Sequence, residues 1–111
     1  MQDSTKIKKK VGIMKFAEII QQYKPEEIEC TKHTFIRLSE KQRKIFTCSE
    51  LKKIIMNYKP FLVGIQNNEN YAVFYNYKNK HLKLKVIVDL DNRKIKIVTF
   101  YFIEEWQIPK I

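Results

Sequence analysis

Glycine and cysteine are both scarce in this sequence, with two residues of each among 111. A loop that wraps phosphates needs several glycines close together, so nucleotide-binding folds built on such a loop are excluded. Neither Cys30 nor Cys48 belongs to a Cys-x-x-Cys pair, which excludes a zinc knuckle and a disulfide framework. We expect two reduced thiols in a cytoplasmic protein, with a single bridge between them as the alternative.

Long apolar runs and metal motifs are also lacking. No stretch approaches the roughly twenty apolar residues that cross a membrane, and the opening MQDSTKIKKK leads into an amphipathic stretch rather than a signal peptide. We therefore expect a soluble, cytoplasmic protein with no membrane partner. There is no His-Glu-x-x-His motif, and Asp89 and Asp91 fall in a hairpin turn with Asn92, so we expect no metal and no other cofactor.

Positive charge is what the sequence has in excess. Lysine and arginine number 22 against 12 acidic residues, which gives a formal charge of +10, and 13% of the residues are aromatic. A folded core with a strongly basic surface favours a polyanionic partner, which is RNA, DNA, an anionic membrane surface or an acidic protein. The alternative is a composition bias toward lysine, isoleucine and asparagine that serves solubility alone.

Hydrophobic periodicity predicts helices in the first half of the chain. The expected helices cover residues 11–23, 32–44 and 47–58. The first has apolar residues at spacings of three and four and ends before Pro25. Thr31 and Thr47 are the expected N-caps of the other two.

From Phe61 onward the hydrophobic period is two, which predicts strands. The expected strands cover residues 61–66, 70–77, 81–89 and 93–102. The predicted fold class is α+β, with two or three N-terminal helices packed on one face of a four-stranded antiparallel meander sheet. The length of the chain predicts a single domain over 1–111. The expected parts are a basic flexible N-terminus (1–10), a helical part (11–58), a β-meander (60–103) and a C-terminal tail (104–111).

Strict alternation along the last two strands predicts which side chains share a face. Leu82, Leu84 and Val86 fall on one face of their strand, and Lys83 and Lys85 on the other. On the last strand, one face is predicted to hold Ile95, Ile97, Thr99 and Tyr101, and the other Lys96, Val98, Phe100 and Phe102. We expect Lys83, Lys85 and Lys96 to contact the phosphates of a nucleic acid.

The stretch CTKHTFIRLSEKQRKIF joins a histidine to a run of bases. On a helix, His33, Arg37 and Lys44 fall on one polar stripe, which is either a solvated face or the working face of a nuclease. A helix N-terminus favours a neutral histidine, which suits a general base. Arg37 would clamp a phosphate, and Arg43 and Lys44 would add cations.

Thr-Lys-His33-x-x-x-Arg37 at a helix start, a second short helix and a meander closing on IKIVTFYFI resemble the RelE-like and BrnT-like toxin superfamily. The resemblance covers about residues 28–103 and includes small basic domains that begin T-x-H-x-x-x-R. It implies functional positions at His33, Arg37, Thr99 and Tyr101. The usual R-x-x-E-R continuation is replaced by RLSEKQR, where Arg43 fits the second basic position only loosely.

The resemblance implies a metal-independent endoribonuclease that cleaves mRNA or tRNA by attack of the 2′-hydroxyl, restrained by an antitoxin protein. Two alternatives stay open on the sequence. One is a non-catalytic nucleic-acid-binding protein from a virus or mobile element, and the other is a basic module that binds an acidic protein. The RNA target and the oligomeric state are not determined by the sequence.

Overall fold

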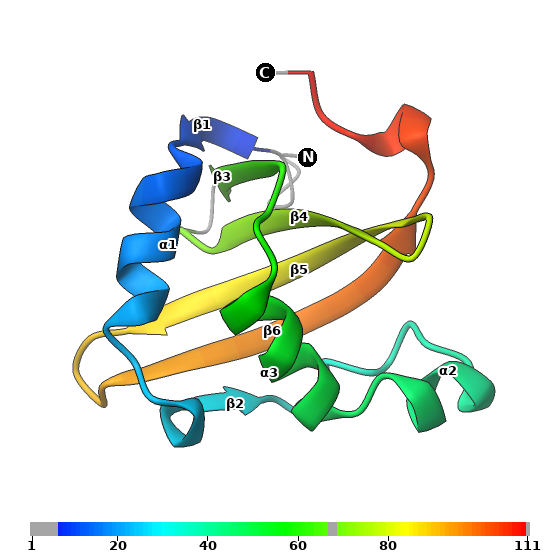
Figure 1. Ribbon diagram of the computed structural model, residues 1–111, viewed down its shortest axis with the longest axis horizontal. Coiled ribbons are helices and arrows are strands. Elements are labelled where there is room, and N and C mark those ends of the chain that lie inside the picture. The colour runs from blue at the N-terminus through cyan, green and yellow to red at the C-terminus, as the bar shows by residue number, and fades with distance from the viewer. Residues whose placement is uncertain (1–6, 67–68, 111) are drawn as a thin grey trace, which may run out of the picture.

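The computed structural model describes residues 7–66 and 69–110, and within these ranges the chain forms one sheet of six strands and three α-helices (Figure 1). The strands are β1 (Ile7–Val11), β2 (Ile28–Cys30), β3 (Leu62–Gln66), β4 (Tyr71–Tyr77), β5 (Lys80–Asp89) and β6 (Lys94–Ile103). The helices are α1 (Ile13–Gln21), α2 (Glu40–Ile45) and α3 (Cys48–Asn57), with short 3₁₀ turns η1 (Pro25–Glu27) and η2 (Glu105–Gln107).

The strands lie in the order β1-β3-β4-β5-β6-β2. The neighbours are antiparallel except for β2 and β6, which are parallel. The meander predicted in the second half of the chain is present as β3 to β6. The predicted four-stranded antiparallel sheet is nevertheless wrong, because β1 and β2 extend it at both edges and make it a mixed sheet.

Both edge strands come from segments in which the sequence signal for a strand is weak. β1 reads IKKKV and lies largely within the segment 1–10, predicted to be a flexible basic terminus. Lysines are common on edge strands because their charges discourage pairing with another sheet. β2 has three residues, IEC, too few to show a period, and lies between the helices predicted over 11–23 and 32–44, in a piece of the chain predicted to be extended.

Helices α1 and α3 lie side by side over one face of the sheet, here called the covered face (Figure 1). Phe16 and Ile20 of α1 and Leu51 and Ile54 of α3 are almost completely buried there. Both helices were predicted, and α3 has the predicted N-cap, since the Thr47 hydroxyl accepts from the backbone N–H of Glu50 at 3.3 Å. The sheet's side of this core includes Val63, Val73, Tyr75, Leu82, Leu84, Val86, Ile95, Ile97 and Phe100.

The helix predicted over 32–44 is wrong in its first half, because residues 32–38 form turns. The backbone here forms single turns, as where the N–H of Thr34 donates to the carbonyl of Thr31 at 3.2 Å, and it also bonds to the edge of β6. Thr31 donates to the carbonyl of Ile97 at 3.1 Å, and Phe100 donates to the carbonyl of Thr34 at 3.2 Å. These bonds satisfy backbone groups that a helix would otherwise pair within itself.

Helix α2 begins only at Glu40, after a cap of its own. The Ser39 hydroxyl accepts from the backbone N–H of Gln42 at 3.1 Å, and the Gln42 side chain accepts from the backbone N–H of Ser39 at 2.8 Å. This Ser-x-x-Gln capping box was readable in the sequence and marks the true helix start.

A β-bulge at Val98 changes which side chains of β6 share a face. Val86 pairs with Ile97 and Lys85 pairs with Thr99, so β6 has one extra residue between these two pairs. Phe100 therefore falls on the covered face with Ile95 and Ile97, as its complete burial in the same core shows. The predicted strict alternation is wrong beyond Val98, because an extra residue reverses the facing of every residue that follows.

Cys30, the last residue of β2, and Cys48, the first residue of α3, form a disulfide with their Cα atoms 6.0 Å apart. The expectation of two reduced thiols is therefore wrong, and the single bridge named as its alternative is present. A cross-link that closes a loop of this length stabilises a fold by roughly 3 kcal/mol, mainly by restricting the unfolded chain. It joins the two ends of residues 31–47, here called the bridged segment.

The C-terminal tail packs only in part. Ile108 contacts a small apolar cluster made by Leu62, Ala72, Phe74 and Ile103 on the face of the sheet opposite α1 and α3. Trp106, in contrast, is 81% exposed. No helix within 7–66 or 69–110 has the length and apolar character needed to span a membrane.

Candidate nucleic-acid interface

The face of the sheet opposite α1 and α3 carries the lysines of β5. Because Leu82 and Leu84 point into the covered face, Lys83 and Lys85 point away from it. Lys83 is paired across the strands with Tyr101, and Lys85 with Thr99. Directly paired residues project from the same side of a sheet. We call the surface formed by Lys83, Lys85, Lys96, Thr99 and Tyr101 the basic face.

The bulge at Val98 is what brings these residues together. Without it, Thr99 and Tyr101 would share the covered face with Ile95 and Ile97. With it, the two strand residues implied as catalytic lie among the three lysines predicted to contact phosphates. The resemblance and the charge pattern had selected these two groups of residues separately, and the structure places them on one surface.

Arg37 and Lys83 both contact the ring of Tyr101. The Arg37 Cζ atom lies 4.6 Å from the ring centroid, and the Lys83 Nζ atom lies 5.6 Å from it. Lys83 Nζ is also 5.6 Å from the ring of Phe74. Distances of this size allow cation–π attraction, which holds the cations in place. We call these three residues the Arg37–Tyr101–Lys83 cluster.

A stacked guanidinium keeps the N–H donors at its edge free for an oxyanion. In the part of the chain that the structure describes, no residue accepts a hydrogen bond from the Arg37 side chain, which is exposed. Lys83 differs in its burial, with 9% of its surface exposed. The cluster therefore places the exposed guanidinium of Arg37 beside the largely buried positive charge of Lys83.

The two ends of the basic face differ in their neutralising charges. At the end near β2, Lys94 pairs with Glu29 at 3.1 Å and Lys96 with Asp89 at 3.5 Å. Hydrogen bonds from Asn92 hold the pKa of Asp89 below its ordinary value. No carboxylate of a described residue forms an ion pair with Arg37 or Lys83. Uncompensated positive charge is therefore found at the cluster.

Thr34 fixes the bridged segment beside Tyr101. Its hydroxyl is completely buried, donates to the carbonyl of Ile97 at 2.6 Å and accepts from the backbone N–H of Thr31 at 2.9 Å. Three residues later the chain reaches Arg37. Thr34 is a positioning residue that the sequence analysis missed, although two threonines three residues apart are typical of a hydroxyl-bonded turn.

His33 is exposed in this turn, with its backbone N–H donating to the Thr31 hydroxyl at 3.3 Å. His33 does not begin a helix, so its predicted place at a helix N-terminus is wrong. Arg37 contacts Tyr101 of β6, whereas His33 bonds to Thr31 within the turn.

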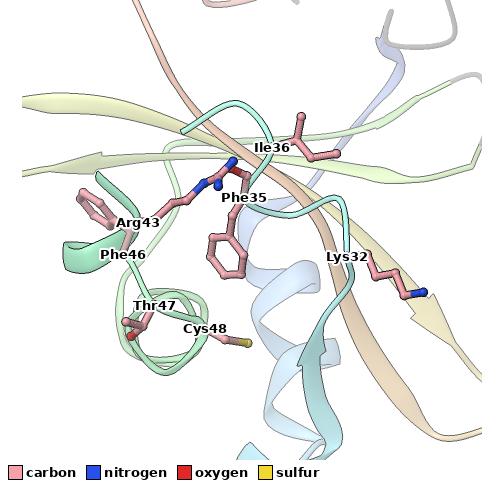
Figure 2. A pocket seen from close by; sticks show the side chains of 7 residues that line it. All are labelled: Lys32, Phe35, Ile36, Arg43, Phe46, Thr47 and Cys48. Carbon is pink, nitrogen blue, oxygen red and sulfur yellow. The ribbon is translucent and has the colours of Figure 1, made fainter. Parts of the chain in front are cut away.

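Arg43 and Lys44, predicted to add cations, lie on α2. The Arg43 Nε donates to the carbonyl of Phe35 at 3.0 Å, and the side chain lines a cavity next to Phe46 and Cys48 (Figure 2). Lys44 is exposed. The structure shows no contact between either residue and the basic face.

Two tyrosines of β4 belong to the covered core and are not available to stack on bases. Tyr75 is completely buried and Tyr77 is 8% exposed. Tyr101 is the tyrosine that lies on the basic face. No group of three or more histidine, cysteine, aspartate or glutamate side chains gathers as a metal site within 7–66 and 69–110.

One family model, described as the MJ0788 family, matches residues 8–98 of the chain. No curated protein and no solved structure matches it. The match covers all six strands except Ile7 of β1 and the end of β6, and its description states no activity. The function has to be argued from the site.

Proposed function

The chain belongs to the MJ0788 family, and we propose that its basic face binds single-stranded RNA. The observation that supports this proposal most strongly is the cluster in which Arg37 and Lys83 share the ring of Tyr101 without a carboxylate partner among the described residues. Two uncompensated cations favour phosphate, and an aromatic ring beside them favours an unpaired base.

The shape and chemistry of the face support single strands and RNA. A sheet face presents side chains over a broad surface, which suits bases that are splayed out and does not enter a duplex groove. The hydroxyls of Thr99 and Tyr101 stand on the same face as the lysines. Hydroxyl groups there can bond to the 2′-hydroxyl that distinguishes RNA from DNA.

The test is the affinity for a labelled single-stranded RNA of about twelve nucleotides, measured by fluorescence anisotropy at several salt concentrations. Lys83→Met keeps an apolar stem between the rings and removes the charge. We expect Lys83→Met and Arg37→Ala each to weaken binding by about three- to tenfold and to lower the salt dependence by about one phosphate contact. A DNA oligonucleotide of the same sequence and an RNA duplex should bind more weakly.

Lys15→Met is the matched control, because Lys15 is an exposed lysine of α1, on the other side of the sheet. Lys15→Met lowers the net charge of the protein by the same amount as Lys83→Met. If it weakens binding as much as Lys83→Met, attraction depends on net charge alone and the basic face is not the site. No RNA binding at physiological salt, together with a tight complex with an acidic protein, would favour the protein-interaction alternative.

A second candidate function is the metal-independent endoribonuclease of toxin type. One observation favours it: the turn that carries His33 is bonded to β6 through Thr34, and Arg37 of the same turn reaches Tyr101. His33 would act as the general base or acid, Arg37 would stabilise the phosphorane-like charge, and Thr99 and Tyr101 would orient the substrate. An antitoxin protein is then an expected partner.

Cleavage is tested by incubating the protein with total RNA and tRNA in EDTA beside His33→Ala, with the product ends mapped. Products ending in 2′,3′-cyclic phosphate with the wild type alone would establish the nuclease. If the wild type and His33→Ala both bind RNA and neither cleaves it, the protein is a binding module.

A further inference from the structure

A cavity of about 470 Å³ opens between the bridged segment and the start of α3 (Figure 2). Phe35 and Phe46 form an apolar wall, Arg43 and Lys32 supply positive charge, and Cys48 of the disulfide lines the same space. Cys30 and Cys48 are both partly exposed. A cavity that reaches a disulfide gives small molecules access to its sulfur, which is one condition for thiol exchange.

Arg43 gives this cavity a preference for anions. Its Nε donates to the carbonyl of Phe35 at 3.0 Å, which fixes the side chain, and Figure 2 shows Arg43 reaching toward Phe35. The two terminal amino groups of the guanidinium are left for another acceptor. No described carboxylate forms an ion pair with Arg43. A guanidinium group binds carboxylate and phosphate groups well, because it can donate two parallel hydrogen bonds to either.

We propose that the cavity admits a small thiol that bears a carboxylate, and that this thiol exchanges with the Cys30–Cys48 disulfide and thereby controls the position of Arg37. The effect on RNA rests on the proposed function, whereas the exchange itself does not. The incoming thiolate forms a bond to Cys48 Sγ, the Cys30–Cys48 bond breaks, and Cys30 leaves as a thiolate that takes a proton from water. A second thiolate then attacks the small molecule's sulfur and releases Cys48, so that two thiols are oxidised and the protein disulfide is reduced.

Reduction of the Cys30–Cys48 disulfide removes one of the restraints on the position of Arg37. The bridged segment is held to the rest of the fold by the disulfide, by the bonds of Thr34 to β6 and by the buried side chains of Leu38 and Phe46. Without the disulfide, ordering Arg37 over Tyr101 costs more conformational entropy. Binding that depends on this arrangement should weaken by about three- to tenfold.

The exchange is measured on the oxidised, undenatured chain with 3-mercaptopropionate, which carries a carboxylate, and with the neutral 2-mercaptoethanol. Each rate is divided by the rate of the same thiol on a linear peptide disulfide, and the adduct is located by mass spectrometry. We expect the mixed disulfide at Cys48 and a normalised rate about two- to fivefold higher for the anionic thiol. Arg43→Gln should lower this preference even though Lys32 remains in the cavity wall, and Lys41→Gln, at an exposed lysine of α2, should retain it.

Absence of a mixed disulfide until the protein is denatured, an adduct at Cys30 in place of Cys48, or an unchanged preference in Arg43→Gln would each overturn the exchange site. The control of Arg37 is measured by limited proteolysis of the bridged segment and by RNA affinity, comparing the oxidised protein with the reduced, alkylated protein and with Cys30→Ser/Cys48→Ser. Faster cleavage and weaker RNA binding support it, and equal values in all three forms overturn it. If the oxidised protein binds no RNA, the proposed function fails, while the adduct and the proteolysis still decide the exchange.

Discussion

On β5, Leu82, Leu84 and Val86 are completely buried against α1 and α3, whereas Lys83 and Lys85 lie one residue away on the opposite face. The covered face is assembled from apolar side chains, and burial of apolar surface accounts for its composition. The basic face is built on the same strands, yet it holds Lys83 with 9% exposure and no ion pair to a described carboxylate.

The contrast separates residues that folding needs from residues that it does not need. A largely buried cation without a carboxylate partner stabilises a fold less than an apolar side chain of similar volume would. Its presence beside Arg37 and Tyr101 therefore points to a ligand that supplies the missing negative charge. The predictions below test whether stability depends on one face and binding on the other.

The largest effect on stability is expected from Phe100, which is completely buried and contacts the rings of Phe46 and Phe102. Phe100→Ala should lower the free energy of unfolding by about 3–5 kcal/mol, because it leaves a cavity in the covered core. The adjacent Tyr101→Ala, on the basic face, should cost less than about 2 kcal/mol and should weaken RNA binding. Urea denaturation and RNA anisotropy measure the two effects, and equal losses of stability would break the distinction between the faces.

The facing of Phe100 and Tyr101 is also where sequence reasoning fell short. Periodicity correctly predicted strands β3 to β6, helices α1 and α3 and the cap of α3, because each has enough residues to repeat a pattern. It could not place the bulge, since Val98 is an ordinary strand residue and the extra position exists only relative to β5.

The sequence therefore predicted the individual residues of the candidate site but not that they lie together. Thr99 and Tyr101 were selected by the resemblance, Arg37 by the helical pattern and the resemblance, and Lys83 by alternation. Their meeting depends on the turn at Thr34, which forms because the edge of β6 accepts the backbone of residues 31–34. A bond between residues more than sixty positions apart leaves no local signal, and the local pattern favoured a helix there.

The turn itself is tested by Thr34→Val, which keeps the shape of the side chain and removes its hydroxyl. The substitution removes the hydroxyl's bonds to the carbonyl of Ile97 and to the N–H of Thr31, which still bond to each other, so it should cost about 1 kcal/mol. RNA binding should weaken as well, because Arg37 loses its anchor. Thr34→Ser, which restores the hydroxyl, should recover the RNA affinity. A loss of affinity that Ser does not recover would show that the hydroxyl does not position Arg37.

An effect of similar size and opposite sign is expected inside the covered face. The Tyr75 hydroxyl is buried and has no hydrogen-bond partner among the described residues. Tyr75→Phe removes an unpaired polar group from the core and should raise the free energy of unfolding by about 1 kcal/mol. Tyr58→Phe, at a tyrosine that is 42% exposed, should change it by less than about 0.5 kcal/mol. A loss of stability in Tyr75→Phe would mean that the hydroxyl has a bonded water.

The same hydroxyl predicts a pH dependence. Burial raises the pKa of Tyr75 above its ordinary value of 10.0. Below pH 10 the hydroxyl is protonated in both the folded and the unfolded chain, so it adds no pH dependence. Above pH 10 the unfolded chain releases the proton and the folded chain retains it, so the wild type should lose stability faster than Tyr75→Phe. Thermal unfolding between pH 8 and 11 measures the difference, and parallel curves would contradict it.

The smallest effect is expected at the acidic end of the basic face. Asp89 accepts hydrogen bonds from the backbone and side-chain nitrogens of Asn92, and these bonds lower its pKa. A carboxyl whose pKa is lowered in the folded state stabilises the fold above the pKa of the unfolded carboxyl, and this stabilisation is lost as the pH falls through the lower pKa of the folded state. The wild type should therefore exceed Asp89→Asn in melting temperature at pH 7 and approach it near pH 2.

Because Asp89 also pairs with Lys96 at 3.5 Å, Asp89→Asn should increase RNA affinity slightly, by less than about twofold. Asp91→Asn, an exposed turn residue, removes the same charge without that pair, so an equal increase there would show that Lys96 contributes to binding only through net charge.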